Sequence, residues 1–418
     1  MKIFSLKFLL PYLFIFSFFL SVFAAFSWIK QDPATDNEHQ PRHRDGDIWV
    51  SAYLASWQHN AGTPYSNWGK LTTRDINWDA FTHLFYFSLG IGKDGRPRSS
   101  LDPEKRNNLN TDRLRDIVPA AHRNQKKILF SVGGSGSYEG FSSAIKPENR
   151  SRFIGTIVEF ITVYGFDGVD LDMEPIYRKD HKNYRDFVFL LHREFSGMRT
   201  KNGDRPLITI AALKGTSVSE LYAGIQQYVD QINIMTYDMA QAWEGWQAWH
   251  NSALYSKGMN FDSNGSEMSS IEQKVEIALD AGIEPYKLGI GVDFYGYIWH
   301  GVHYLGKWQG WPDEDLSIME RPGGVPYYEL NERFNLQNAS WDTIAQTPYL
   351  NVENPKAFVS FDNERSVQRK VQFAIEKGLG GIILWELGGG FIQSNRPGEK
   401  SPLLDAVKQE AAQYRITP

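Results

Sequence analysis

The stretch from Phe166 to Pro175, FDGVDLDMEP, places four acidic residues in a short run that is otherwise apolar or turn-forming. Side chains alternate between the two faces of a β-strand, so every second residue faces the same way. One face then carries Asp170, Asp172 and Glu174. The other carries Val169, Leu171 and Met173. We predict that the apolar face packs on helices and that the three carboxylates point into a barrel, rising toward its C-terminal rim.

Carboxylates on one strand face are spaced about 6.5 to 7 Å apart. In a poorly solvated interior they cannot all ionise at low cost, so a proton is shared and at least one pKa is raised. A raised pKa suits a general acid near neutral pH, which predicts Glu174 as the acid, Asp172 beside it and Asp170 deepest. The alternatives are an exposed acidic face or a structural cation site, which the apolar partner face disfavours. Asp167 has the opposite parity and is interpreted as a structural acid.

Seven other short runs rich in β-branched or aromatic residues read as strands, at 48–57, 81–90, 126–134, 207–213, 231–239, 287–296 and 380–388. Most are continuously apolar, as are parallel strands covered on both faces. Helical stripes lie between them, for example over 149–164 and 184–198. This alternation predicts an α/β fold of the TIM (β/α)8 barrel type, with the active site at the C-terminal ends of the strands. An open doubly wound sheet is the alternative.

The interval between the last two predicted strands is the longest in the chain, whereas a helix and its loops need only about 30 residues. It is rich in Trp, Tyr, Gly and Pro. We therefore predict a small α+β insertion subdomain at residues 297–356, within a catalytic barrel that spans residues 48–411.

The N-terminus has the pattern of an exported protein: Lys2 and Lys7 precede an apolar run at residues 8–26. Residues 1–29 are interpreted as a signal peptide or an uncleaved membrane anchor, since about 18 apolar residues suffice to span a bilayer. Residues 30–47 are predicted to be a polar linker. The expected location is secreted, extracellular or periplasmic, or membrane-anchored through residues 8–26.

Composition excludes several classes of function. The net charge is only -5 and no Lys/Arg stripe is present, so we expect no nucleic-acid partner. The absence of cysteine excludes disulfides, thiolate metal sites and a cysteine nucleophile. No metal-site, P-loop or dinucleotide motif occurs, so we expect no metal and no cofactor. We expect a monomer.

A second group of candidate residues lies in NIMTYDM, within the run 231–239. Strand parity aligns Met235 with Tyr237 and places Asp238 at the strand end. These residues either orient a polar substituent of a substrate or form core and a helix cap.

Aromatic residues make up 14% of the chain, with 13 Trp, which indicates either a large core or a groove lined with rings that stack on sugars. Trp385 is predicted to face inward, as an apolar floor under a sugar ring or as core. Trp243, Trp246 and Trp249 form either a sugar platform or loop packing. The glycines of SVGG, Ser131 to Gly134, allow a close backbone approach at a strand end.

Taken together, these motifs resemble glycoside hydrolase family 18, the chitinase family. FDGVDLDMEP matches its Asp-x-x-Asp-x-Asp-x-Glu signature, SVGG its strand-three motif and MTYD its strand-six motif. Trp385 and the insertion also fall where the family has them, so the resemblance runs from about Ile48 to Glu410. Three positions depart from the family pattern, namely Met173, Ser135 and Tyr297.

The resemblance implies a substrate-assisted retaining mechanism, an exception to the usual scheme of two carboxylates. Glu174 would protonate the glycosidic oxygen while the 2-acetamido carbonyl of the substrate attacks C1. Asp172 would hold the acetamido N–H, and Asp170 would share a proton with Asp172.

The resemblance also implies the substrate-binding residues. Tyr237 would bind the acetamido oxygen, and Asp238 and Trp385 would position the distorted sugar. Tyr53, Met235 and Trp243 complete the predicted substrate-binding set.

The predicted function is a glycosidase that cleaves β-1,4-linked N-acetylglucosamine in chitin or chito-oligosaccharides. The alternatives are a peptidoglycan or glycoprotein N-acetylglucosaminidase, and a chitinase-like lectin that binds without cutting.

Overall fold

The structure is a computed structural model that describes residues 48–58, 71–96, 111–240, 246–307 and 324–414. The chain divides into two units, residues 1–42 and 43–418. All described residues belong to the second unit.

Within the described ranges, eight parallel strands close into a barrel in the order β1-β13-β7-β6-β5-β4-β3-β2. The strands are β1 (Trp49–Ala55), β2 (His83–Leu89), β3 (Lys127–Gly133), β4 (Gly168–Asp172), β5 (Leu207–Ala212), β6 (Gln231–Ile234), β7 (Leu288–Asp293) and β13 (Gly381–Trp385). Each lies inside one of the eight predicted runs. The closed sheet confirms the TIM barrel and excludes the open doubly wound sheet.

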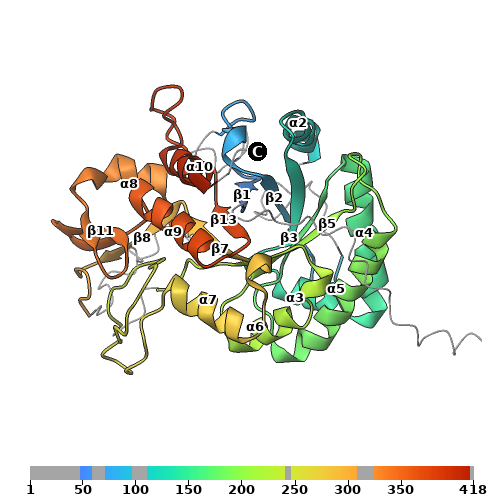
Figure 1. The fold of residues 1–418 in the computed structure, drawn as a ribbon, viewed down its shortest axis with the longest axis horizontal. Helices are drawn as coiled ribbons and strands as arrows, with labels where there is room; N and C mark the ends of the chain where they lie inside the picture. Colours follow the sequence, from blue (N-terminus) through green and yellow to red (C-terminus); the bar gives the residue numbers. More distant parts are fainter. Residues whose placement is uncertain (1–47, 59–70, 97–110, 241–245, 308–323, 415–418) are drawn as a thin grey trace, which may run out of the picture. The chain divides into compact units, whose positions relative to one another are not determined.

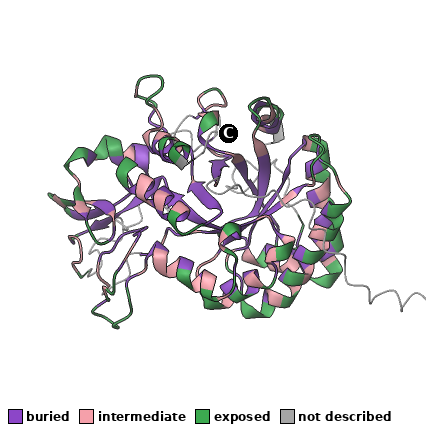
Figure 2. Cartoon of the chain, viewed as in Figure 1, coloured by how far each residue is buried: buried purple, intermediate pink, exposed green. Residues whose placement is uncertain are grey.

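Helices follow the strands and lie outside the barrel (Figure 1). They are α2 (Thr111–Arg123), α3 (Tyr138–Ala144), α4 (Pro147–Tyr164), α5 (His181–Ser196), α6 (Thr216–Ala223), α7 (Ile271–Asp280), α9 (Glu364–Glu376) and α10 (Pro402–Tyr414). The strands are buried, whereas the helices have exposed outer surfaces (Figure 2). The apolar face of β4, formed by Val169, Leu171 and then Met173, is fully buried in the core that contains the helix stripes. The acidic face of β4 therefore points into the barrel interior.

A second, smaller sheet has the strand order β10-β11-β12-β8-β9. It consists of β8 (Tyr295–His300), β9 (Val325–Pro326), β10 (Ser340–Asp342), β11 (Thr347–Glu353) and β12 (Lys356–Ser360), with α8 (Tyr327–Arg333) after β9. Its strands lie between β7 and β13 in the chain, as predicted for the insertion. They extend beyond the predicted bounds 297–356 at both ends, because β12 pairs antiparallel with β8 and holds both in the small sheet.

Asp167 lies at the opposite end of β4 from the acidic rim and is buried. Its carboxylate accepts hydrogen bonds from the Ile128 backbone N–H, from His122 Nε2 and from Asn202 Nδ2, each at 2.9 Å. It thus joins the start of β3, helix α2 and the turn before β5. The structural interpretation of this acid agrees with its contacts.

An Asp167→Ala variant is expected to lose about 3 kcal/mol in the free energy of unfolding, because buried donors would lose their acceptor. Urea denaturation followed by circular dichroism measures this loss. The matched control is Asp204→Ala, whose partner Lys127 lies in an exposed pair, and it should change stability little. Equal stability of the two variants would contradict the structural role of Asp167.

No helix in the described ranges is both long enough and apolar enough to cross a bilayer. Residues 1–29 and 30–47 lie outside the described residues, so the signal peptide or anchor and the polar linker stay predictions.

Candidate active site

The acidic face of β4 points into the barrel, but the strand ends at Asp172 rather than continuing to Pro175. Asp170 and Asp172 are buried, while Glu174 lies two residues beyond the strand end and is partly exposed. The three predicted carboxylates are therefore brought together, with Glu174 nearest to solvent. Its place is set by the loop after β4 and not by strand alternation.

Asp170 is tied to both neighbours of β4 in the barrel and to the more distant β1. It accepts hydrogen bonds from the hydroxyls of Tyr53 at 2.9 Å, Ser131 at 2.9 Å and Thr209 at 2.7 Å, which come from β1, β3 and β5. Burial raises the pKa of Asp170, and the three hydroxyl donors oppose this rise. Tyr53, predicted to bind substrate, thus contacts the deepest carboxyl of the site.

Asp172 and Glu174 lie near enough to shift each other's pKa. Burial raises the pKa of Asp172 far above its usual range, and the charges of Glu174 and Asp170 add to the rise. Burial also raises the pKa of Glu174, and Asp172 partly opposes this rise. The charge of Glu174 affects the pKa of Asp172 more than that of Asp170 does. The proton shared between Asp170 and Asp172, which the family resemblance implies, stays a prediction.

One oxygen of Asp172 has no hydrogen-bond partner. Oδ1 is buried and unpaired within the described part of the chain. An unmet buried acceptor costs about 1 to 3 kcal/mol and is rare in folded proteins. This oxygen is therefore available to a donor from a ligand.

The SVGG glycines are required because residues of β4 and β2 lie too close to them for a side chain to fit. The Gly134 N–H donates to the Asp172 carbonyl at 2.8 Å. A Cβ on Gly133 would lie 2.0 Å from that same carbonyl oxygen, and one on Gly134 would lie 2.4 Å from the Phe87 ring. The predicted close backbone approach thus positions the strand end that carries Asp172.

Strand β6 ends at Ile234, so the predicted strand does not extend through Met235, Tyr237 and Asp238. Asp238 has a positive φ of 52°, and its backbone N–H donates to Asn251 Oδ1 at 2.9 Å. The Asn251 side chain therefore accepts the hydrogen bond that a neighbouring strand would otherwise accept. The positions of Tyr237 and Asp238 depend on tertiary contacts rather than on strand parity.

Two tyrosines from the start of the small sheet hold the Asp238 carboxylate. Tyr295 donates to its Oδ1 at 2.5 Å and Tyr297 donates to the same atom at 2.6 Å. Tyr297 is the residue that departs from the family pattern at this position. The departure therefore supplies a hydroxyl donor to Asp238.

Tyr237 is buried, and its ring lies 6.1 Å from that of Tyr295. Burial raises the pKa of Tyr237 strongly, and the charges of Asp172, Asp238 and Glu174 raise it further. The phenol therefore stays protonated and can donate a hydrogen bond next to the carboxylates.

Lys214 was missed by the sequence analysis. It follows the end of β5, and its ammonium donates to the Tyr237 carbonyl and, at 3.5 Å, to the Asp238 carbonyl. Burial lowers the pKa of Lys214, which the charges of Asp238 and Glu174 partly offset. The signal in the sequence is a lone lysine directly after the apolar run LITIAAL.

Trp385 is the last residue of β13 and is partly buried. Its ring lies 5.2 Å from that of Tyr53 and 4.9 Å from that of Phe87, and Met235 packs in the same cluster. In the strand order, β13 lies across the barrel from β4. These side chains form an apolar surface on the side of the barrel opposite to the acids.

The structure describes two of the three tryptophans that follow β6. Trp243 lies outside the described residues. Trp249 is fully buried and donates its indole N–H to the Ser269 carbonyl at 2.9 Å, so it is loop packing. Trp246 is partly buried, with its ring 4.7 Å from that of Phe261.

In the described ranges, no three His, Asp or Glu side chains are grouped so that they could hold a metal ion. Asp170 and Asp238 instead accept hydrogen bonds from hydroxyl groups. Proton transfer and hydrogen bonding are the chemistry that these groups can perform.

Comparison with known proteins identifies the family. The sequence model of glycosyl hydrolases family 18 matches residues 50–390. Chitinase A1 of Niallia circulans is 32% identical over 288 residues, which cover 63% of this chain and 40% of that protein. Endochitinase of Manduca sexta is 26% identical over 392 residues, which cover 85% of this chain and 68% of that protein. The chain thus spans well under half the length of the first of these relatives.

A solved structure supports the same assignment. The Group IV chitinase of Ostrinia furnacalis, in complex with allosamidin, superposes with a TM-score of 0.70 at 26% identity. The match covers 88% of this chain and 100% of that one. The family model spans most of the sequence and includes every strand of the barrel except the first residue of β1, so the resemblance is confirmed: the chain belongs to glycosyl hydrolases family 18.

Proposed function

We propose that this protein hydrolyses β-1,4-linked N-acetylglucosamine in chitin or chito-oligosaccharides by substrate-assisted retaining catalysis. The observation that carries the proposal is the unpaired Oδ1 of Asp172, buried beside a partly exposed Glu174 of raised pKa. A buried acceptor next to a general acid fits a sugar that brings its own amide N–H to the cleavage point. The names of the relatives, Chitinase A1 and Endochitinase, agree with this substrate class.

Glu174 starts the reaction by transferring its proton to the glycosidic oxygen, whose bond to C1 breaks as the leaving sugar departs. The acetamido carbonyl oxygen of the substrate forms a bond to C1 from the opposite face, which gives a cyclic oxazolinium ion. Asp172 accepts the acetamido N–H and stabilises the positive charge. Water then attacks C1 as the bond between C1 and the oxazolinium oxygen breaks, which restores the acetamido group. The water gives its proton to the Glu174 carboxylate, which regenerates the acid, and the anomeric configuration is retained.

The hydrogen bonds of the other carboxylates near the site favour the substrate's own acetamido group as the nucleophile. Asp170 accepts three hydroxyl hydrogen bonds, and one oxygen of Asp238 accepts two. A carboxylate held in this way is a poor nucleophile, because its lone pairs are engaged and its position is fixed. The acetamido oxygen of the substrate takes that role, and the Tyr237 hydroxyl orients it.

The apolar surface of Trp385 supports the position of the sugar. The face of a sugar ring that carries C–H groups is apolar and can pack on the indole ring of Trp385. Because β13 lies across the barrel from β4, a sugar on Trp385 presents its glycosidic bond toward Glu174.

The proposal is tested with a series of chito-oligosaccharides, fully acetylated and fully deacetylated, whose products are identified by mass spectrometry. We expect cleavage of the acetylated series only, because the deacetylated sugar has neither the amide nucleophile nor the N–H donor. Equal cleavage of both series would refute the mechanism. Binding without release of reducing ends would favour the lectin, and faster release from cell walls than from chitin would favour the peptidoglycan enzyme.

Replacing Lys214 with methionine is expected to move the alkaline limb of the pH profile of kcat/KM to higher pH. Burial raises the pKa of Glu174, and the nearby ammonium of Lys214 is one of the groups that lower it. Without the ammonium the pKa of Glu174 rises further, so the acid keeps its proton to higher pH. The measurement is the pH dependence of kcat/KM on a soluble oligosaccharide.

The matched control is Lys214→Arg, which keeps the positive charge and should keep the alkaline limb close to that of the wild type. A limb that moves to lower pH in Lys214→Met, or one that moves equally in both variants, would contradict this role of the charge.

We also propose that the chain is exported through residues 1–29, on the pattern of Lys2, Lys7 and the apolar run that follows. Mass spectrometry of the mature N-terminus distinguishes cleavage after Ala24 or Ala25 from retention of the whole segment as an anchor.

A further inference from the structure

The segment from Thr236 to Asp238 carries two residues of the proposed site, yet no strand holds it. Asp238 has a positive φ, which is uncommon for a residue with a side chain, although aspartate adopts it more often than most. The segment therefore depends on contacts from other parts of the fold.

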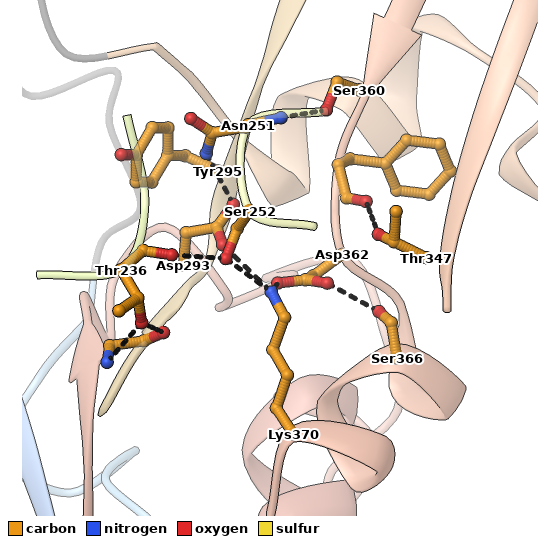
Figure 3. Close-up of polar contacts among 12 residues, drawn as sticks. Thr236, Asn251, Ser252, Asp293, Tyr295, Thr347, Ser360, Asp362, Ser366 and Lys370 are labelled. Carbon is orange, nitrogen blue, oxygen red and sulfur yellow. Dashed lines mark hydrogen bonds and ion pairs between the residues drawn. The ribbon is translucent and has the colours of Figure 1, made fainter. Parts of the chain in front are cut away.

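Thr236 is held on two sides. Its Oγ1 donates to the Gly291 carbonyl and accepts from the Gly291 N–H, each at 2.8 Å. Its own carbonyl accepts from Ser252 Oγ at 2.7 Å (Figure 3). Ser252 is buried, so no solvent molecule competes easily for this bond.

Asp238 is held through Asn251. The Asn251 side chain accepts the Asp238 backbone N–H at 2.9 Å and donates to Asp293 Oδ2 at 2.8 Å. The backbone N–H of Asn251 donates to Ser360 Oγ, at the end of β12, at 2.7 Å. The amide is thus fixed between the barrel and the small sheet.

Ser252, which holds Thr236, and Asp293, which holds Asn251, both contact the buried ammonium of Lys370 on α9. Its Nζ lies 2.7 Å from Ser252 Oγ and 3.5 Å from Asp293 Oδ1, and it also pairs with Asp362 (Figure 3). The Lys370 side chain is 0% exposed. A buried charge is costly unless it is fully paired, so this ammonium is confined to one position by its partners.

Lys370 lies between two buried carboxyl groups, those of Asp293 and Asp362. Burial raises the pKa of Asp293 to about 7, and Asp362 adds to the rise while Lys370 opposes it. Such a group is rigid, because moving any member leaves another unpaired.

We propose that Lys370 is a positioning residue for hydrolysis, which through Ser252 and through Asp293 with Asn251 fixes the backbone that carries Tyr237 and Asp238. This inference rests on the proposed function, in which Tyr237 orients the acetamido oxygen for attack on C1. A misplacement of about 1 Å in such a group costs about 100-fold in rate. Lys370 itself lies on a helix outside the barrel and touches neither carboxylate of the acid pair.

The test compares two buried serines that bond to the same group. Ser252→Ala removes the link from Lys370 to Thr236, whereas Ser366→Ala removes a hydroxyl that donates to Asp362 at 2.7 Å on the side of α9. We expect Ser252→Ala to lower kcat by about 10- to 100-fold with little change in KM. Ser366→Ala should keep kcat at the wild-type value, and both are assayed well below their melting temperatures.

A double-mutant cycle with Tyr237→Phe separates positioning from stability. If Ser252 acts through Tyr237, the loss in kcat of the double variant is smaller than the product of the two single losses. Strictly multiplicative losses, or equal kcat values for the two serine variants, would overturn the proposal. Lys370→Met should behave as Ser252→Ala does, and Lys370→Arg should restore part of kcat.

Hydrogen exchange gives a readout that does not depend on activity. The Asp238 amide should exchange faster in Asn251→Ala and in Lys370→Met than in the wild type, while amides in β3 and β4 stay protected. Unchanged exchange at Asp238 would overturn the positioning role. If the wild type cuts no acetylated oligosaccharide, the proposed function fails, and this exchange experiment still decides whether Lys370 holds the segment.

Discussion

A Glu174→Gln variant is expected to lose about 10³-fold in kcat on acetylated chito-oligosaccharides while it binds them with nearly wild-type affinity. Glutamine keeps the shape of glutamate and can still hydrogen-bond, but it has no acidic proton for the glycosidic oxygen. Glu174 is suited to the role because burial raises its pKa and because it lies at the open end of the acidic strand. Release of reducing ends measures kcat, and calorimetry measures binding.

The matched control for this change is Glu159→Gln on α4, which removes the charge of an exposed glutamate. It should keep wild-type kcat. Turnover of Glu174→Gln within a few-fold of the wild type would remove Glu174 from the role of general acid. Loss of binding together with turnover would show instead that the variant had lost the shape of the site.

An Asp172→Asn variant is expected to lose about 10² to 10³-fold in kcat, because the oxazolinium ion would lose the negative charge beside it. Asp172 and Glu174 also shift each other's pKa, so the change alters the acid as well as the acceptor. Single-turnover kinetics on an acetylated substrate measures the chemical step directly.

Asp180→Asn is the control for this substitution. Asp180 is also a buried aspartate in the loop region after β4, where it accepts hydrogen bonds from Tyr138 and Ser142. Its replacement should change stability but keep kcat. If Asp180→Asn and Asp172→Asn lost kcat equally, the effect would come from the loop as a whole and not from the carboxylate beside the acid.

The local pattern of FDGVDLDMEP was enough to predict the acidic strand. A period of two is a property of the strand itself, so it can be read without knowing what packs around it. The same holds for the other runs that became barrel strands, since each is a short apolar segment between turn residues. The strand ends were less predictable, since β4 ends before Glu174 and β6 ends before Tyr237. Where a strand ends depends on its hydrogen-bond partners in neighbouring strands, which come from distant parts of the sequence.

The groups that hold the site in place could not be predicted in this way. Tyr295 and Tyr297 hold Asp238 from a chain separation of more than fifty residues, and Lys370 reaches Ser252 across 118. No periodicity links such positions, and a lysine in an amphipathic helix has the pattern of a surface residue. The sequence by itself determined which faces of the strands are acidic or apolar, and hence the barrel, since these depend on neighbouring residues in the chain. Only the tertiary structure decided how Tyr237, Asp238 and Glu174 are oriented, because their positions are set by hydrogen bonds and buried charges from segments that folding brings together.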